Sequence, residues 1–337
     1  MLWTVTWRTL RQLIILLLLL LVLAVAAASQ INEAIFSPPR RVLQEYHMDR
    51  LTNPTHYGLT IRSHQCLEGK APCLLVEPDA LSGAGKRGKK LRRQLAHKQF
   101  ELPAYGRVKG MVVLLHGRKG RKEDLLPVAE RFVAAGFRCL LLDMPAHGDN
   151  TVNTMSFGES LFERDLPSKA LQEVKQHFAL PDEPAALWGM SMGGAFAISA
   201  ASQASAEWDA LMIVSSFSSL AEVLDAQIPA KWKGAVDALM PLLNMERQLR
   251  SYPAINTIQP KQSAASINIP TLLVHGERDA YVVPAQGRAL YNAIPHDNKL
   301  WITVPDAGHA NVLATPMPLY SEMSAWLLNQ FSQLPER

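Results

Sequence analysis

Short apolar runs alternate with amphipathic stretches along most of the chain, from about residue 57 to the end. Six of these runs have the length of buried strands and are bounded by turn residues; they lie at 111–115, 139–142, 185–188, 210–214, 272–274 and 300–304. Stretches with helical spacing separate them, for example 124–135, 168–178 and 318–331. This alternation predicts an open α/β fold with a mostly parallel sheet and helices on both faces.

The alternation pauses between residues 216 and 269. Leucine, methionine and tryptophan are mixed there with Pro229 and Pro241. We predict a mostly helical, lid-like insert ahead of the next strand. With this insert, 57–332 forms one domain, although 337 residues are enough for two.

The N-terminal region is the most apolar part of the chain. Residues 13–28 form an unbroken apolar run that follows Arg8 and Arg11. As a helix this run would be roughly 24 Å long, which is longer than the apolar core of most signal peptides and shorter than a full membrane span. We predict a membrane anchor over 1–28. A cleaved signal is the alternative, because three alanines precede Ser29. A buried core helix is disfavoured because the run has no polar face.

The flanking residues predict where the body lies. Positive charges ahead of the apolar run favour export of the body to the periplasmic or extracellular side, or secretion if the signal is cleaved. Cys66 and Cys73 either close a small disulfide loop in an oxidising compartment or remain thiols, and Cys139 lies in an apolar run. We predict that 29–56 is a tether, stiffened by the prolines that follow Ser37.

Charge and cysteine content exclude several classes of protein. Lys and Arg number 34 against 30 Asp and Glu, and seven cations lie within 86–98, inside a basic insert at 80–100. A globally basic nucleic-acid binder is therefore excluded. Three cysteines without a Cys/His cluster argue against a structural metal. The insert is either a solvated loop or a short amphipathic helix, with Leu91 and Leu95 on one face, that binds anionic lipid.

A Gly-x-Ser-x-Gly sequence centred on Ser191 lies between an apolar run and an alanine-rich helical stretch. Such a strand-to-helix turn exposes the serine hydroxyl above the sheet edge. Gly189 and Gly193 leave space for the turn. We predict that Ser191 is a nucleophile.

A nucleophilic serine needs a base and a group that orients the base. His309 follows the last apolar run, and Asp279 follows the run before it. Both therefore lie at the carboxyl ends of strands, where open α/β sheets bind ligands. We predict His309 as the base and Asp279 as the acid, with Glu277 and Asp225 as rivals for the acid.

Backbone amides should stabilise the negative charge that develops on a substrate carbonyl. The residue after the nucleophile, Met192, supplies one N–H, and Arg118 in the loop after the 111–115 run supplies the other. His116 and His147 are expected to brace their loops through hydrogen bonds rather than to transfer protons.

Five segments in this order, HGRKG, LDMPAHG, WGMSMGGA, HGERDAYVVP and DAGH, resemble the α/β-hydrolase superfamily of serine hydrolases. The resemblance covers roughly 57–332 and is greatest to the serine aminopeptidase and monoacylglycerol-lipase-like group and to membrane-anchored α/β-hydrolase-domain proteins. It implies the same roles for Ser191, Asp279, His309, Met192 and Arg118, and it implies no cofactor.

The expected activity is hydrolysis of carboxylic acyl esters through an acyl-enzyme, with lipid-derived acyl substrates fitting the anchor. The expected partners are such a substrate and, through the N-terminal segment, a membrane, with no nucleic acid. Aminopeptidase, amidase or thioesterase activity on the same fold is the alternative. An aminopeptidase could use acidic residues of the insert to bind the substrate amine. A non-catalytic scaffold is less consistent with a complete triad.

Overall fold

The computed structural model describes residues 2–203 and 208–335. In this part of the chain, eight strands form one sheet in the order β1-β2-β4-β3-β5-β6-β7-β8. The strands are β1 (Leu59–Cys66), β2 (Ala71–Pro78), β3 (Gly110–Leu115), β4 (Phe137–Leu142), β5 (Ala185–Met190), β6 (Ala210–Val214), β7 (Thr271–Gly276) and β8 (Lys299–Val304). β2 is antiparallel to both of its neighbours, and all other pairs are parallel. The predicted α/β fold is confirmed.

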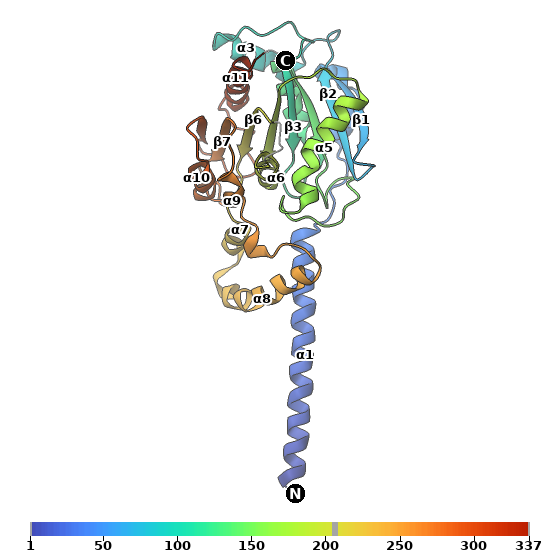
Figure 1. Cartoon of the computed structure of the whole chain (residues 1–337), viewed down its shortest axis with the longest axis vertical. Helices are drawn as coiled ribbons and strands as arrows, with labels where there is room; N and C mark the ends of the chain where they lie inside the picture. Colours follow the sequence, from blue (N-terminus) through green and yellow to red (C-terminus); the bar gives the residue numbers. More distant parts are fainter. Residues whose placement is uncertain (1, 204–207, 336–337) are drawn as a thin grey trace.

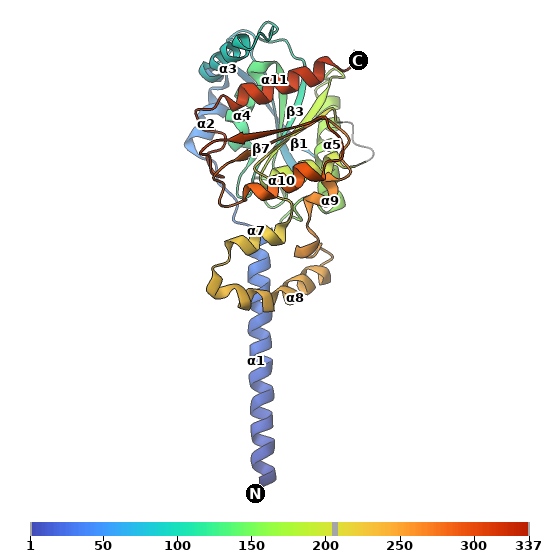
Figure 2. The ribbon, with the colours of Figure 1, turned by 90° about the vertical axis from the view of Figure 1, so that its left-hand side faces the viewer.

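Helices cover both faces of this sheet (Figures 1 and 2). They are α1 (Leu2–Phe36), α2 (Glu45–Thr52), α3 (Lys86–His97), α4 (Leu126–Ala135), α5 (Leu161–His177), α6 (Met192–Ala201), α7 (Leu220–Gln227), α8 (Lys233–Leu249), α9 (Pro260–Ala264), α10 (Pro284–Ala293) and α11 (Leu319–Ser332). Along β3, Val113 packs in the core with α5, α6 and α10, whereas Val112 and Leu114 pack in the core with α3, α4 and α11. Alternate side chains of a strand point to opposite faces, so a strand buried on both sides is apolar at nearly every position, which is why five of the six apolar runs were recognisable; the sixth, in β8, lies at the sheet edge and is only partly buried.

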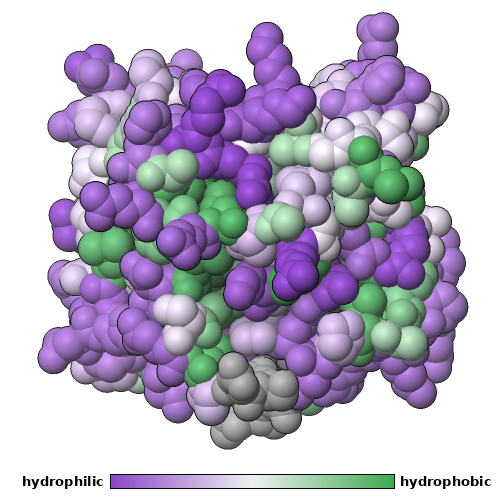
Figure 3. All heavy atoms as spheres, turned by 90° about the horizontal axis from the view of Figure 1, so that it is seen from above, coloured by the Kyte–Doolittle hydropathy of each residue, from purple (hydrophilic) through white to green (hydrophobic). Residues whose placement is uncertain are grey.

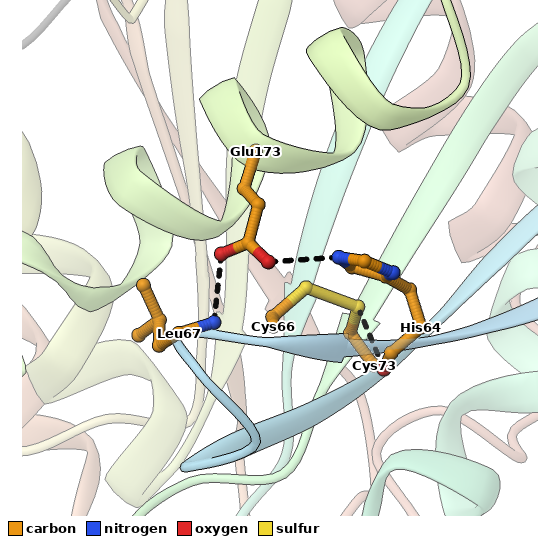
Figure 4. The surroundings of a disulfide bond; sticks show 5 residues. All are labelled: His64, Cys66, Leu67, Cys73 and Glu173. Carbon is orange, nitrogen blue, oxygen red and sulfur yellow. Dashed lines mark hydrogen bonds and ion pairs between the residues drawn. A yellow bond between two sulfur atoms is a disulfide. The ribbon is translucent and has the colours of Figure 1, made fainter.

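The β1–β2 hairpin was not predicted. β1 lies at the sheet edge, and its side chains are mostly half-buried or exposed. Cys66 and Cys73 form a disulfide that closes this hairpin (Figure 4). Above it, the carboxylate of Glu173 from α5 accepts the N–H of Leu67 at 2.7 Å and contacts Nε2 of His64 at 2.8 Å. Of the two states expected for these cysteines, the structure contains the disulfide.

Helix α1 is one continuous helix that projects from the body (Figures 1 and 2). The most apolar window within residues 6–36 has a mean hydropathy of 2.9 and is almost entirely exposed. Among the described helices, this one alone is long and apolar enough to cross a bilayer. It is not a core helix, in agreement with the sequence analysis.

The segment 29–56 differs from the predicted tether. Helix α1 continues to Phe36, and Ala28, Asn32 and Phe36 are buried against the body on one face. Helix α2 follows, and its buried His47 contacts Asp124 at 2.8 Å. Residues four apart lie on the same side of a helix, so contacts with the body extend the helix beyond the apolar run.

The insert over 216–269 is largely helical, as predicted, and contains α7, α8 and α9. Helix α8 lies across α1 next to the body in both views (Figures 1 and 2). The Asn32 side-chain amide donates to the carbonyl of Leu243 at 3.1 Å. The insert is thus attached to the N-terminal helix as well as to the sheet.

The amphipathic helix predicted for the basic insert is confirmed, and the alternative of a solvated loop is wrong. Residues 86–97 form helix α3, so the segment is not a loop. Leu91 and Leu95 are buried in the core beside α4 and α11 and therefore cannot contact lipid. Helix α3 also lies at the end of the molecule opposite α1 (Figure 1). Seen from that end, the surface is mainly hydrophilic with small apolar patches (Figure 3).

Candidate active site

A sharp turn joins β5 to α6, and Ser191 is the residue between them. Its φ of 54° and ψ of −119° are strained for a residue with a side chain. A β-carbon on Gly189 would lie 2.2 Å from the carbonyl oxygen of Gly193, and one on Gly193 would lie 2.1 Å from that of Leu115. Only glycine fits at these two positions, so the motif's glycines are required by the turn itself.

Neighbouring strands hold the strained turn in place. The N–H of Ser191 donates to the carbonyl of Val214 at 2.8 Å, and the hydroxyl of Ser216 donates to the carbonyl of Ser191 at 2.8 Å. Val214 ends β6, and Ser216 follows it. Both backbone polar groups of the serine are therefore paired, and its side chain alone is directed to the site.

The structure brings together the three residues predicted to act on a substrate. Nε2 of His309 lies 3.0 Å from Oγ of Ser191, and Nδ1 lies 2.7 Å from Oδ2 of Asp279. The serine ends β5, the aspartate follows β7 and the histidine follows β8. With Nδ1 protonated, the imidazole donates to the carboxylate and accepts from the hydroxyl.

The Asp279 carboxylate is buried and fully hydrogen-bonded. Its other oxygen accepts the N–H groups of Tyr281 at 3.0 Å and Val282 at 2.8 Å. Burial raises the pKa of this carboxyl, but the hydrogen bond and charge of His309 and the Val282 N–H outweigh it. The pKa lies below its ordinary value, so Asp279 is ionised at neutral pH.

The two rival carboxylates lie elsewhere. Asp225 forms an ion pair with Lys233 at 2.7 Å, in the helical insert. Glu277 is exposed and accepts the N–H of Asp306 at 3.2 Å. Of the three acidic candidates, the structure brings only Asp279 into contact with His309.

The loop after β3 lies next to the nucleophile. A β-carbon on Gly117 would lie 3.6 Å from Cβ of Ser191. The guanidinium of the following Arg118 donates to the carbonyls of Ala34 and Ile35 at the end of α1. A cation at a helix C-terminus is favourable, because the last carbonyls carry partial negative charge. The loop beside Ser191 is thus fastened to the N-terminal helix, a contact that the sequence did not predict.

Two buried histidines brace the adjoining loops, as expected. His116 accepts the N–H of Met144 at 3.1 Å and donates to the carbonyl of Gly117 at 2.8 Å. Burial lowers the pKa of His116 to about 4. Burial and the neighbouring His116 lower the pKa of His147 to about 3. Both are neutral at physiological pH, and within residues 2–203 and 208–335 their hydrogen bonds are to backbone groups and not to Ser191 or His309.

The N-terminal segment contributes further contacts at this edge that sequence reasoning missed. Arg40 donates to the carbonyls of His147 and Gly148, each at 3.0 Å. The N–H of Met155 donates to the carbonyl of Phe36 at 2.9 Å. These partners are more than 100 residues apart in sequence, and no local pattern pairs them. Over residues 2–203 and 208–335, no cluster of three or more His, Cys, Asp or Glu side chains is placed to hold a metal.

Comparison with known proteins supports a hydrolase. Residues 106–257 match the family model of serine aminopeptidase S33. An uncharacterised 31.7 kDa protein from the traX-finO intergenic region of Escherichia coli is 25% identical over an alignment of 251 residues, and the match covers 63% of this chain and 87% of that protein. An esterase from Pyrococcus furiosus has a similar structure, with a TM-score of 0.60 and 17% identity over 88% of this chain and 99% of the esterase.

A 2,6-dihydroxy-pseudo-oxynicotine hydrolase is also similar, with a TM-score of 0.56 and 17% identity over 81% of this chain and 68% of the hydrolase. At these identities, the two solved structures support the fold alone. The sheet order and the strand-to-helix turn at Ser191 are those of the α/β-hydrolase fold, and residues 106–257 of the chain are similar to serine aminopeptidase S33.

Proposed function

We propose that this α/β-hydrolase cleaves carboxylic acyl esters, with Ser191 as nucleophile, His309 as base and Asp279 as the acid that orients it. The observation that carries the proposal is the pair of consecutive hydrogen bonds, 3.0 Å from serine to imidazole and 2.7 Å from imidazole to carboxylate. A serine hydroxyl is a weak nucleophile unless an oriented base accepts its proton.

In this mechanism, Oγ of Ser191 attacks the ester carbonyl while Nε2 of His309 takes the hydroxyl proton. The N–H groups of Met192 and Arg118 stabilise the oxyanion; Met192 begins α6, where the helix dipole also favours negative charge. His309 then protonates the leaving alcohol, which departs as the acyl-enzyme forms. Water repeats the two proton transfers, releases the acid and restores Ser191.

An ester substrate is favoured over a peptide by the state of the acidic residues in the insert. An aminopeptidase needs a carboxylate to bind the substrate's free amine. Glu222 accepts a hydrogen bond from Gln286, Asp225 pairs with Lys233, and Glu246 pairs with Arg250. Three of the four carboxylates of the insert therefore already have a partner, and the fourth, Asp237, is exposed on α8. The three paired carboxylates support an esterase rather than an aminopeptidase.

The test combines a covalent probe with two substrate panels. A fluorophosphonate should label the wild type and the exposed-serine control Ser266→Ala, but not Ser191→Ala. Turnover of p-nitrophenyl esters should fall about 10⁶-fold in Ser191→Ala. Esters of graded chain length should be cleaved faster than aminoacyl-nitroanilides. Normal ester turnover in a folded Ser191→Ala variant would reject the mechanism.

We also propose that α1 is retained as an anchor and that the body lies on the exported side. Ala28, Asn32 and Phe36 are built into the body, so the helix is part of the folded structure on both sides of the Ser29 site. The disulfide between Cys66 and Cys73 is consistent with an oxidising compartment. Sequencing the mature N-terminus tests this proposal, because a start at Ser29 contradicts the anchor.

A further inference from the structure

Helix α8 is apolar on two opposite sides. Leu243 and Arg247 are buried against α1 and the body, and this defines its inner side. The centre of the side facing away carries Ala238, Pro241, Met245 and Leu249 at exposed positions, with the exposed polar residues Asp237 and Gln248 at its margin. Met245 is 49% and Leu249 78% exposed. A helix that faces water on its outer side normally carries polar residues there, so this outer stripe requires another explanation.

The position of α8 along α1 explains its apolar outer side. Asn32 bonds to Leu243, and the Arg247 guanidinium lies 3.2 Å from the centre of the Phe36 ring. Asn32 is four residues beyond Ala28, the end of the apolar run, which is roughly 6 Å along the helix. If α1 spans a bilayer, α8 therefore packs across α1 at the depth of the lipid headgroups. Amphipathic helices that bind membranes lie at this depth.

The residues that precede α8 match the same environment. Trp232, directly ahead of the helix, is 57% exposed, and tryptophan is enriched at the level of the headgroups. Lys231 and Lys233 flank it and are exposed. Cations near the bilayer surface are attracted to anionic lipid.

We infer that residues 230–249, here called the collar, lie in the headgroup region of the bilayer that α1 crosses, with Trp232, Met245 and Leu249 directed to the acyl chains. The inference rests on the proposal that α1 is retained as an anchor. The collar is an interaction surface whose partner is a lipid bilayer.

The collar also connects the bilayer to the nucleophile. Phe36, beneath Arg247, packs edge-on against Phe157 at 5.7 Å, and Phe157 packs against Phe217 at 6.0 Å. Phe217 follows Ser216, whose hydroxyl bonds to the Ser191 backbone. Apolar side chains therefore lead from the collar to the active-site edge. The substrate class that fits is an acyl ester resident in the membrane.

The first test measures depth without using activity. The full chain, reconstituted in vesicles of phosphatidylcholine and phosphatidylglycerol, is labelled with an NBD dye on single cysteines introduced as Met245→Cys, Leu249→Cys or Lys90→Cys. Selective labelling is feasible because Cys139 is buried and the other two cysteines are bonded. Nitroxide lipids should quench the dye at 245 and 249 and not at 90. Equal quenching at all three positions, or quenching at none, overturns the inference that the collar lies in the headgroup region.

The second test measures substrate access. The double variant Met245→Asp/Leu249→Asp should hydrolyse a vesicle-embedded acyl ester at least ten-fold more slowly and a short, soluble ester at the normal rate. Its matched control is Lys89→Asp/Arg93→Asp on α3, which should leave both rates unchanged. Equal rates on the embedded ester for both variants overturn the access role. Failure of the proposed function is distinguishable, because it appears as a lack of Ser191-dependent turnover of the soluble ester.

Discussion

The two ends of the hydrolase body differ in almost every respect that bears on function. At one end lie α1, the collar and the carboxyl edge of the sheet with Ser191, His309 and Asp279. At the other end lies α3, which carries most of a run of seven cations and packs on the body through its buried leucines and the guanidinium of Arg92. From sequence, the cations were the more obvious membrane-binding feature. The structure places them away from the anchor.

The difference shows that charge density is a poor guide to a membrane-facing surface when the fold is not known. In α3 the apolar residues point inward and the charged ones outward, as in any surface helix. In α8 apolar residues point both inward and outward. The second pattern is the less common one, and it occurs next to the helix that leaves the body. The following experiments test the contrast, from the largest expected effect to the smallest.

The largest effect in this series is expected on kcat when Asp279, the proposed acid of the triad, is replaced. Asp279→Asn should lower kcat about 10⁴-fold, because an amide favours the wrong imidazole tautomer. The matched control is Glu277→Gln, two residues away and exposed. It should leave kcat within a factor of about 2, since exposed charges contribute little. If Glu277→Gln lowered kcat strongly and Asp279→Asn left it unchanged, Glu277 and not Asp279 would be the acid.

Acid should destabilise the catalytic end through its buried histidines. Burial lowers the pKa of His116 to about 4, so between pH 6.5 and 4 the unfolded chain binds a proton that the folded chain does not. The contribution of His116 alone to the free energy of unfolding therefore falls as pH decreases through this window, by about 2 kcal/mol from pH 6.5 to pH 5. Chemical denaturation of the full chain in non-ionic detergent at these two pH values measures the change.

The difference in pH dependence between the wild type and His116→Gln isolates the contribution of His116 from those of the other titrating groups. His116→Gln should lose that share of the pH dependence, whereas His97→Gln, exposed on α3, should retain it. Glu163 acts in the opposite direction: burial raises its pKa to about 7, so its protonation stabilises the fold as pH falls. The same pH dependence in His116→Gln and wild type would contradict the assignment.

The attachment of α1 to the loop beside Ser191 should have a moderate effect. Arg118→Met keeps the backbone N–H and removes the cation from the carbonyls of Ala34 and Ile35. It should cost about 1–2 kcal/mol of unfolding free energy, measured by thermal unfolding in detergent. The corresponding change at the other end, Arg93→Met on α3, should be silent. An Arg118→Met variant as stable as Arg93→Met would show that this contact is not stabilising.

The smallest effect is expected from the basic helix itself. Replacing Lys89, Lys90 and Arg93 with glutamine should leave both membrane association and ester turnover unchanged, in flotation and p-nitrophenyl ester assays. Arg92 is excluded from this variant because its guanidinium donates to the carbonyls of Ala134 and Pro103. Loss of flotation in the triple variant would restore α3 as a membrane-binding element.

The sequence predicted the parts of the molecule that are encoded locally. Strands β3 to β7 were recognisable because both faces are buried and nearly every position is therefore apolar, whereas the edge strand β8 was recognisable from its apolar residues alone. The positions of Ser191, Asp279 and His309 at strand ends followed from the same pattern. The β1–β2 hairpin was missed because an edge strand tolerates polar residues, as β1 does at Arg62 and His64.

The contacts of α1 were beyond sequence reasoning for a different reason. Asn32 bonds to a carbonyl 211 residues away, and Arg118 to carbonyls 83 and 84 residues away. Such pairs depend on how helices and strands pack in the folded protein, which no local sequence pattern encodes. The same holds for α3, whose amphipathic pattern was read correctly while the surface it covers was not.

The unbroken course of α1 from the apolar run into the body has a consequence for kinetics. Ala28, Asn32 and Phe36 are held by the body, so the exposed part of α1 continues into the hydrolase as one helix; the consequence holds if α1 spans a bilayer, as proposed. An enzyme held in this way at constant height above the leaflet searches in two dimensions. Its rate would follow the mole fraction of ester among the surrounding lipids rather than the bulk concentration, and dilution of that ester with inert lipid at constant total lipid would slow turnover, whereas dilution of the vesicles in buffer would not.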